Sequence, residues 1–393
     1  MKLKGVSYDV GRVMMGENWR PNFDLKIVKH ELEIIQDDLH CNAVRICGLD
    51  INRLLTASEY ALDLGLDVWL SPELWDKSQD ETLAYIAEAS GAAEPLRQKF
   101  PGKLVFSVGS ELTLFMKGIV PGDNVFERLN NPAFWEGVRS GKYNEPLNDF
   151  LEKANKTVRE RFHGEVTYCA VPFERVKWSM FDYVGIDLYR DGRSRQIYDR
   201  MLQSFPAFGK PVVIGEFGCC TYRGAELLGG NGFMIMFGMI KNLQPTLVLP
   251  KLFSDMVSVI PQVDGHYVRD EGLQAREVVD QLGLLDRAGV EGAFVFTFVS
   301  PNSPYNDDPR FDSDMGSYSL VKSFAQKKSV EEHAKQVAKQ GWALLGVELD
   351  PEILDKFAGD IGKHGETYPD MPWEPKEAFK AVAKFYKDHW SLL

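Results

Sequence analysis

The sequence is poor in histidine and cysteine, and neither residue follows a metal-binding or disulfide pattern. Only seven of its 393 residues are histidines, and because no HxH or HExxH pattern occurs among them, a histidine-rich metal centre is not expected. The five cysteines are odd in number and form no CxxC pair, which argues against a disulfide framework or a zinc ribbon. We therefore predict a reduced, cytoplasmic protein that carries neither a metal nor another cofactor.

Long hydrophobic runs and an excess of basic residues are absent as well. The N-terminal segment MKLKGVSY lacks the apolar core of a signal peptide, and no later run approaches the length of a membrane span. The formal net charge is -12, whereas nucleic acids and anionic membranes require a basic surface. We expect neither a nucleic acid nor a membrane as partner, and the sequence leaves the oligomeric state open.

Nucleotide and calcium motifs are also missing. There is no Walker A motif, and Gly229–Gly232 does not follow a predicted strand as a dinucleotide-binding loop would. The segment Asp312–Gly316 has two aspartates but lacks the remaining ligands of an EF-hand. We therefore expect a solvated loop there.

What the sequence does contain is an alternation of short apolar runs with amphipathic stretches of helical length, which is typical of βα units. The runs are apolar throughout, as in parallel strands covered on both faces. Eight runs in this order predict an α/β protein with a (β/α)8 TIM barrel. The predicted strands are Leu3–Tyr8, Ala43–Cys47, Asp67–Leu70, Leu104–Val108, Val166–Val171, Tyr183–Leu188, Val212–Ile214 and Ala293–Phe298.

Helical patterns fill the gaps, and two of the predicted loops are long. The long loops follow the fourth strand (residues 113–144) and the seventh (218–270), on the face where barrel enzymes build their active sites. We predict a catalytic barrel over residues 1–328 and, over 329–393, a helical C-terminal extension that packs on it without a strand. The predicted helices are Leu25–Leu39, Ser58–Leu64, Glu81–Phe100, Pro146–Phe162, Ser194–Phe205 and Gly272–Ala288.

Two glutamates stand at the ends of predicted strands. Glu111 ends the fourth strand and Glu216 the seventh, and these strands face each other across an eight-stranded barrel. Cleavage of an acetal needs a proton on the leaving oxygen and a negative charge facing the oxocarbenium-like carbon, so two carboxyls in one pocket can divide these roles. We predict Glu111 and Glu216 as the catalytic pair.

Other strand ends supply candidates for binding a substrate. Arg45 would keep Glu216 ionised, Tyr189 could donate a hydrogen bond to it, and tryptophans could stack on a sugar ring. Asp9, Glu73 and Glu174 are interpreted either as hydroxyl ligands or as loop charges. The predicted substrate-binding residues are Arg45, Tyr8, Ser110, Asp187, Tyr189, Trp69 and Trp75.

A glutamate after strand four and another after strand seven resemble the signature of the clan A (4/7 superfamily) retaining glycoside hydrolases. Ile214–Gly218 resembles the nucleophile strand of that clan, and Val44–Ile46 resembles the strand with the arginine beside the nucleophile. Asp182–Tyr189 resembles the sixth strand, whose tyrosine commonly contacts the nucleophile. The resemblance implies Glu216 as nucleophile and Glu111 as acid/base.

The chain departs from that pattern at two places. Ser110 stands where the clan usually has the asparagine that binds the sugar 2-hydroxyl, although some families have a small hydroxyl residue there. The eighth strand reads Phe296-Thr297-Phe298 where the clan usually has a tryptophan under the sugar. Both departures bear on the substrate more than on the type of reaction.

The predicted function is a retaining glycoside hydrolase or transglycosylase that acts by double displacement on a small-molecule or oligosaccharide glycoside. One alternative is a catalytically silent barrel that binds carbohydrate or serves in phage defence, because Glu111–Gly118 is similar to uncharacterised bacterial proteins labelled abortive-infection proteins. The presence of both glutamates argues against that alternative. A lysine Schiff-base aldolase is a weaker alternative, because no strand end carries a lysine in an apolar run.

Overall fold

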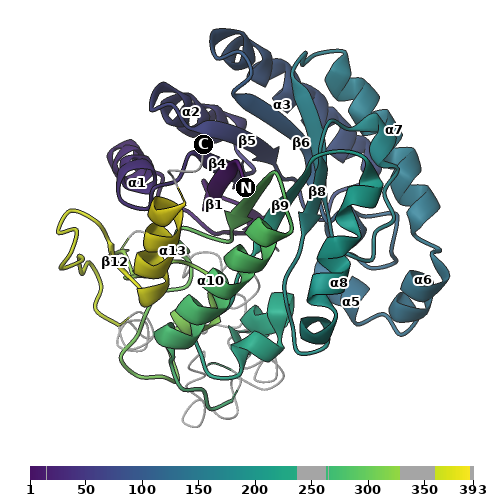
Figure 1. Ribbon diagram of the computed structural model, residues 1–393. Coiled ribbons are helices and arrows are strands. Elements are labelled where there is room, and N and C mark those ends of the chain that lie inside the picture. The colour runs from purple at the N-terminus through teal and green to yellow at the C-terminus, as the bar shows by residue number, and fades with distance from the viewer. Residues whose placement is uncertain (15, 237–262, 264, 328–358, 390–393) are drawn as a thin grey trace, which may run out of the picture.

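The computed structural model describes residues 1–14, 16–236, 263, 265–327 and 359–389 (Figure 1). Eight parallel strands close into a barrel in the order β1-β10-β9-β8-β7-β6-β5-β4. Each strand overlaps one predicted run, so the (β/α)8 prediction is confirmed. The strands are β1 (Leu3–Asp9), β4 (Ala43–Gly48), β5 (Asp67–Pro72), β6 (Leu104–Ser110), β7 (Glu165–Ala170), β8 (Val184–Asp187), β9 (Val212–Phe217) and β10 (Gly292–Val295).

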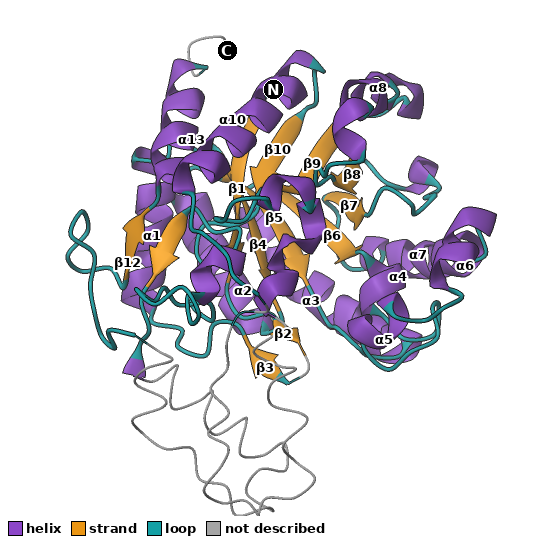
Figure 2. Ribbon diagram, turned by 90° about the horizontal axis from the view of Figure 1, so that it is seen from below, coloured by secondary structure: helices purple, strands orange, loops and turns teal. Residues whose placement is uncertain are grey.

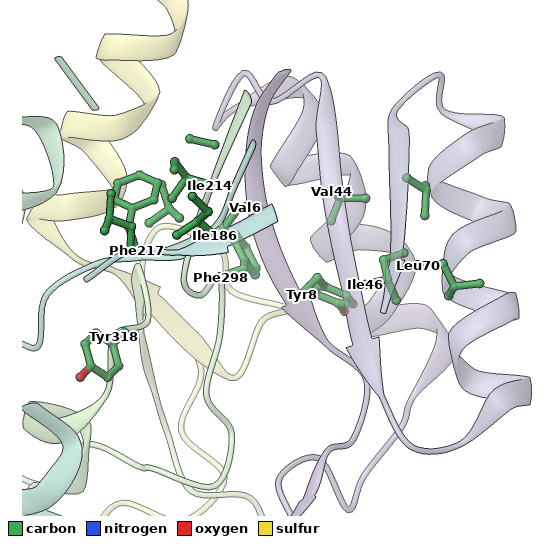
Figure 3. Packing of buried hydrophobic residues seen from close by; sticks show 14 of the residues in the cluster. Val6, Tyr8, Val44, Ile46, Leu70, Ile186, Ile214, Phe217, Phe298 and Tyr318 are labelled. Atoms are coloured by element: carbon green, nitrogen blue, oxygen red, sulfur yellow. The ribbon is translucent and has the colours of Figure 1, made fainter. Parts of the chain in front are cut away.

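Alternate side chains of the strands enter two separate cores. The outer core lies between strands and helices, and Figure 3 shows part of it, including Val44, Ile46 and Leu70. The inner core fills the barrel near the strand starts and forms a floor below the carboxyl ends. Gly5 leaves the room this floor needs, because a Cβ there would lie 2.3 Å from the Phe294 ring. The floor consists of Ala43, Trp69, Val105, Val213 and Phe294.

Four of the helices between the strands, α1, α2, α3 and α10, begin at a side-chain cap. The Asp50 side chain accepts a hydrogen bond from the Arg53 amide at 3.0 Å, so α2 begins at Ile51, seven residues before the predicted start. None of the helices in the described part of the chain has the length and hydropathy that crossing a membrane requires. The principal helices are α1 (Leu25–Asp37), α2 (Ile51–Asp63), α3 (Gln79–Lys99), α7 (Asn144–Arg159), α8 (Tyr198–Gln203) and α10 (Glu271–Arg287).

The loops at the carboxyl ends of the strands carry additional short elements. Those after β6 lie together at one side of the barrel, and a hairpin of β2 and β3 follows β1 (Figure 2). The predicted 218–270 loop contains residues 237–262 and 264, which lie outside the described part. A third long loop, after β10, was not predicted. The short elements are β2 (Val13–Met14), β3 (Glu17–Asn18), α4 (Leu112–Phe115), α5 (Val125–Leu129), α6 (Phe134–Ser140), β11 (Val321–Ser323) and the 3-10 turns Trp178–Met180, Ser194–Gln196, Ala225–Leu227, Gly229–Met236 and Ser313–Gly316. A further 3-10 turn, Phe205–Phe208, lies between α8 and the start of β9.

The C-terminal segment packs closely on the barrel. Helix α13 (Glu377–Asp388) runs along α10, and the Tyr386 hydroxyl donates to the Gly5 carbonyl of β1 at 2.9 Å (Figure 1). It therefore takes the place of the eighth barrel helix. The segment also contains a strand, β12 (Trp373–Pro375), which pairs antiparallel with β11. The expectation of a strandless extension was wrong, because a three-residue strand with a distant partner leaves no local pattern. The division at residue 328 stays a prediction.

The expectation of a solvated loop at residues 312–316 was also wrong. Asp312 and Asp314 are buried, and the Arg269 guanidinium lies 3.0 Å from the first and 2.8 Å from the second. The ammonium group of Lys376, fully buried at the start of α13, lies 2.8 Å from Asp314. The partners of both aspartates come from distant segments, so the local sequence could not reveal them.

This buried ion pair yields a prediction about stability. Lys376→Met should lower the free energy of unfolding by about 3–5 kcal/mol, because Asp314 loses one of its two cations in a fully buried site. Urea unfolding followed by tryptophan fluorescence measures the change. Lys384→Met, at an exposed position of the same helix, is the matched control. Equal stability of the two variants would show that the pair does not hold the segment in place.

Candidate active site

Glu216 lies at the carboxyl end of β9 and is held by three donors. Its Oε1 accepts hydrogen bonds from Arg45 Nη1 at 2.6 Å and from Arg12 Nη2 at 2.9 Å. Its Oε2 accepts from the Tyr189 hydroxyl at 3.0 Å. Burial alone would raise the pKa of Glu216, but the charges of Arg45 and Arg12, with these hydrogen bonds, hold that pKa below its ordinary value. Glu216 is therefore ionised at neutral pH.

Glu73 holds the two arginines in place. Its carboxylate accepts from Arg12 Nε at 2.6 Å and Nη2 at 3.0 Å, and from Arg45 Nη2 at 3.3 Å. All four charged groups are buried, and two further buried carboxyl groups lie beside the arginines, Asp9 at 3.8 Å from Arg12 and Asp187 at 3.9 Å from Arg45. The bidentate contact to Arg12 fixes the plane of that guanidinium.

Arg12 was missed by the sequence interpretation. It lies in the loop after β1, where Asp9 Oδ1 accepts from the amides of Gly11 at 2.7 Å and Arg12 at 2.9 Å. Gly11 has a φ of +127°, which side-chain-bearing residues rarely adopt. A glycine and an arginine, two and three residues after a strand that ends in aspartate, are the only local signal. Asp9 and Glu73 are thus not solvated loop charges. Both carboxyl groups hold Arg12 in place, and their interpretation as ligands of sugar hydroxyls stays a prediction.

Glu111 lies in different surroundings. It follows an irregularity in the pairing of β6 with β7, and its backbone is left-handed, with φ 49° and ψ 43°. No residue in the described part of the chain donates a hydrogen bond to its carboxyl group. Burial, and next the charges of Asp187 and Glu216, raise the pKa of Glu111 well above its ordinary value. These surroundings therefore favour the protonated form of Glu111, whereas those of Glu216 favour the carboxylate.

Ser110 and Asp187 form a pair beside Glu216. The Ser110 hydroxyl donates to Asp187 Oδ2 at 2.7 Å, and Asp187 lies opposite Glu216 in the β8–β9 register. Burial and the charge of Glu216 raise the pKa of Asp187. The one hydroxyl hydrogen of Ser110 is used in this bond, so toward a ligand the serine presents only lone pairs.

Tyr8 and Trp69 lie away from this cluster, so their prediction as substrate-binding residues is corrected. Tyr8 is fully buried on the outer face of β1, donates to Glu31 of α1, and belongs to the packed layer in Figure 3. Trp69 lies in the barrel floor, with its ring 5.4 Å from that of Phe294. Because the predicted strands are apolar throughout, the sequence does not show which side chains face inward or at what depth.

Trp75 does lie at the edge of the site. Its ring stacks on Phe115 at 4.4 Å and meets the edge of Trp19 at 5.3 Å, and the Arg12 guanidinium carbon lies 5.7 Å from its centre. Phe296 borders Arg12 at 5.1 Å. These four rings are only partly buried, and together they form an apolar rim beside the carboxyl groups, of the kind on which a sugar face can stack.

The chain shares its fold with glycoside hydrolases of known structure. A GH113 beta-1,4-mannanase in a complex structure matches with a TM-score of 0.50 and 16% identity, over 81% of this chain and 95% of that one. The GH113 beta-mannanase AaManA from Alicyclobacillus acidocaldarius matches with 0.50 and 14%, over 81% and 93%. A GH2 beta-galacturonidase from Eisenbergiella tayi matches with 0.51 and 12%, over 99% and 51%.

At these identities the likeness shows the barrel fold alone. No model of a known protein family matches the chain, and no curated protein matches it. The predicted similarity to abortive-infection proteins is not shown by any of these comparisons.

The raised pKa of Glu111 predicts that Glu111→Gln stabilises the protein, and more at pH 8 than at pH 5. In the unfolded chain this carboxyl has a pKa of about 4.3, so above that pH unfolding releases a proton that the folded protein retains. The stability of the wild type therefore falls as the pH rises towards the folded pKa, whereas glutamine is unaffected. The gain should grow by up to about 1.4 kcal/mol per pH unit.

Urea unfolding at both pH values measures this gain, with the exposed Glu136→Gln as control. A gain that is the same at pH 5 and pH 8 would contradict a raised pKa of Glu111.

Proposed function

We propose that this protein is a retaining glycoside hydrolase, or a transglycosylase with the same chemistry, in which Glu216 is the nucleophile and Glu111 the acid/base. The observation that carries the proposal is the contrast in surroundings between two glutamates at the ends of β6 and β9, which shifts their pKa values in opposite directions. Two arginines and a tyrosine favour the carboxylate form of Glu216, while burial and the neighbouring carboxyl groups favour the protonated form of Glu111. Double displacement at an acetal needs this division of roles.

In the first step, Glu111 donates its proton to the glycosidic oxygen while Glu216 attacks the anomeric carbon. The C–O bond to the leaving group breaks, the aglycone departs as an alcohol, and a glycosyl ester of Glu216 forms. Oε2 is the better placed oxygen for attack, because Oε1 already accepts two charged hydrogen bonds. In the second step, Glu111 takes a proton from water or an acceptor alcohol, which attacks the same carbon and releases Glu216.

The neighbouring residues have supporting roles in this proposal. Arg45 keeps Glu216 ionised, and Tyr189 donates to the attacking oxygen and stabilises it as it leaves the ester. The Ser110–Asp187 pair offers its lone pairs to sugar hydroxyls, and Trp75 stacks on the apolar face of a sugar ring. Tyr8 and Trp69 have no part in it.

The proposed substrate is a small-molecule or oligosaccharide glycoside. Because similar folds belong to proteins described as beta-1,4-mannanases and a beta-galacturonidase, β-mannosides and β-galacturonides come first in a panel of aryl pyranosides and furanosides of both anomers. A cytoplasmic location is part of the proposal, and it is supported by five unpaired, buried thiols.

Glu216→Ala should reduce turnover on any substrate that the panel identifies to below about a hundredth of the wild-type rate, because no nucleophile remains. The control is Glu165→Ala, which makes the same change in an exposed residue at the opposite end of a barrel strand. Initial rates of the three proteins give the answer. A Glu216→Ala variant that keeps more activity than this would exclude Glu216 as nucleophile.

Glu111→Ala should slow hydrolysis of natural glycosides by about 100-fold or more, and that of dinitrophenyl glycosides far less. Natural leaving groups need a proton as they depart, whereas dinitrophenolate does not. The ratio of kcat/KM values for the two substrate types measures this dependence. Equal losses on both types would argue against Glu111 as the acid.

A further inference from the structure

The turn that carries Glu111 is held by a buried cluster of residues that have no role in the proposed reaction. The cluster consists of Thr113, Tyr168 and Glu174, all buried. Glu174, in the loop after β7, accepts through Oε1 from the Thr113 amide at 3.0 Å and from the Thr113 hydroxyl at 2.6 Å. Glu174 thus binds the second residue after Glu111 by both its backbone and its side chain.

Tyr168 binds Leu112, the residue between Glu111 and Thr113. Its hydroxyl accepts a hydrogen bond from the Leu112 amide at 2.8 Å and donates to Glu174 Oε2 at 2.8 Å. The Val171 amide adds a fourth donor to Glu174 at 3.2 Å. The amides at the start of α4 lack partners within that helix, and this cluster satisfies those of the two residues that directly follow Glu111.

The backbone of Glu111 itself requires such support. Its φ of 49° lies in the left-handed region, which side-chain-bearing residues occupy only where the surroundings over-determine it. The Glu111 amide donates to the Cys169 carbonyl at 2.8 Å. The turn is therefore fixed on both sides by β7 and the loop that follows it, and it has no comparable anchor within its own strand.

We propose that Glu174, acting through Thr113 and Tyr168, is a positioning residue that orients the Glu111 carboxyl towards the glycosidic oxygen. This inference rests on the proposed function, because it assigns Glu174 a role in the protonation step of that reaction.

The charge of Glu174 also favours the protonated form of Glu111, which the proposed acid step requires. Burial raises the pKa of Glu174 to about 7, against the hydrogen bonds from Thr113 and Tyr168. Its negative charge in turn contributes to the raised pKa of Glu111, together with Asp187 and Glu216 and against Arg45. As Glu174 ionises near neutral pH, Glu111 therefore retains its proton to higher pH.

The test compares Glu174→Gln and Tyr168→Phe with Tyr386→Phe. Tyr386 is as fully buried as Tyr168 and also donates one hydrogen bond, but it does so on α13, to Gly5. The control therefore removes the same atom from an equally buried site without touching the turn. Melting temperatures of the four proteins show how far each variant is destabilised.

The kinetic result expected for both turn variants is a loss of about tenfold or more in kcat on natural glycosides, with little loss on dinitrophenyl glycosides. KM should change less than about twofold, since the sugar contacts remain. In Glu174→Gln the alkaline limb of the kcat/KM profile should also move to lower pH, because a negative charge beside Glu111 is gone. Equal losses on both substrate types, or a limb that does not move, would overturn the proposal.

A titration that needs no turnover separates this inference from the proposed function. Carbon-13 NMR of protein labelled at the glutamate carboxyl carbons follows Glu111, whose resonance is identified by its absence in Glu111→Gln. In Glu174→Gln the pKa of Glu111 should fall by about half a unit or more, whereas in Tyr386→Phe it should not change. If the wild type hydrolyses no glycoside but the pKa of Glu111 falls in Glu174→Gln, the proposed glycosidase function is refuted and the action of Glu174 on Glu111 stands. If the pKa of Glu111 does not change in Glu174→Gln, the action of Glu174 on Glu111 is refuted.

Discussion

The charge balance around Glu216 is the constraint on which the rest of the site depends. A carboxylate buried at the end of a barrel strand would take up a proton unless cations offset the loss of water. Arg45 and Arg12 supply these cations at one oxygen atom, and both stay buried because Glu73 balances them. The site thus requires β4, β5, β9 and the loop after β1 to meet at one point, and closure of the barrel provides that meeting.

The carboxyl group of Glu111 has different surroundings from that of Glu216, because β6 ends in a different way from β9. β6 ends at an irregular pairing and a left-handed residue, and no described side chain donates to Glu111. The C-terminal segment supports the opposite wall of the site. Lys376 lies 3.3 Å from the hydroxyls of Ser317 and Ser319, and the ring of Tyr318 between them lies 5.3 Å from Tyr189. The surroundings of these two glutamates thereby shift their pKa values in opposite directions.

The sequence was informative where the signal is local and repeated. Eight apolar runs predicted the barrel, and the strand-end positions of Arg45, Tyr189 and Glu216 singled out three residues that the structure joins by hydrogen bonds. It was uninformative where contacts join distant segments. The hydrogen bond from Arg12 to Glu216 and the ion pair of Lys376 with Asp314 each join residues far apart in the chain, so neither contact leaves a pattern in the local sequence. The prediction that Tyr8 and Trp69 bind the substrate was wrong, because a strand that is apolar throughout does not show which face or which layer of the barrel a side chain occupies.

The most direct test of the central claim is to trap the glycosyl ester of Glu216. The protein is incubated with the dinitrophenyl 2-deoxy-2-fluoroglycoside of a sugar that it hydrolyses, because the fluorine slows the second step more than the first, and the labelled peptide is then sequenced by mass spectrometry. We expect that one sugar is attached and that it is attached to Glu216. A sugar on Glu111 or on another residue, or a product with inverted anomeric configuration, would contradict this expectation.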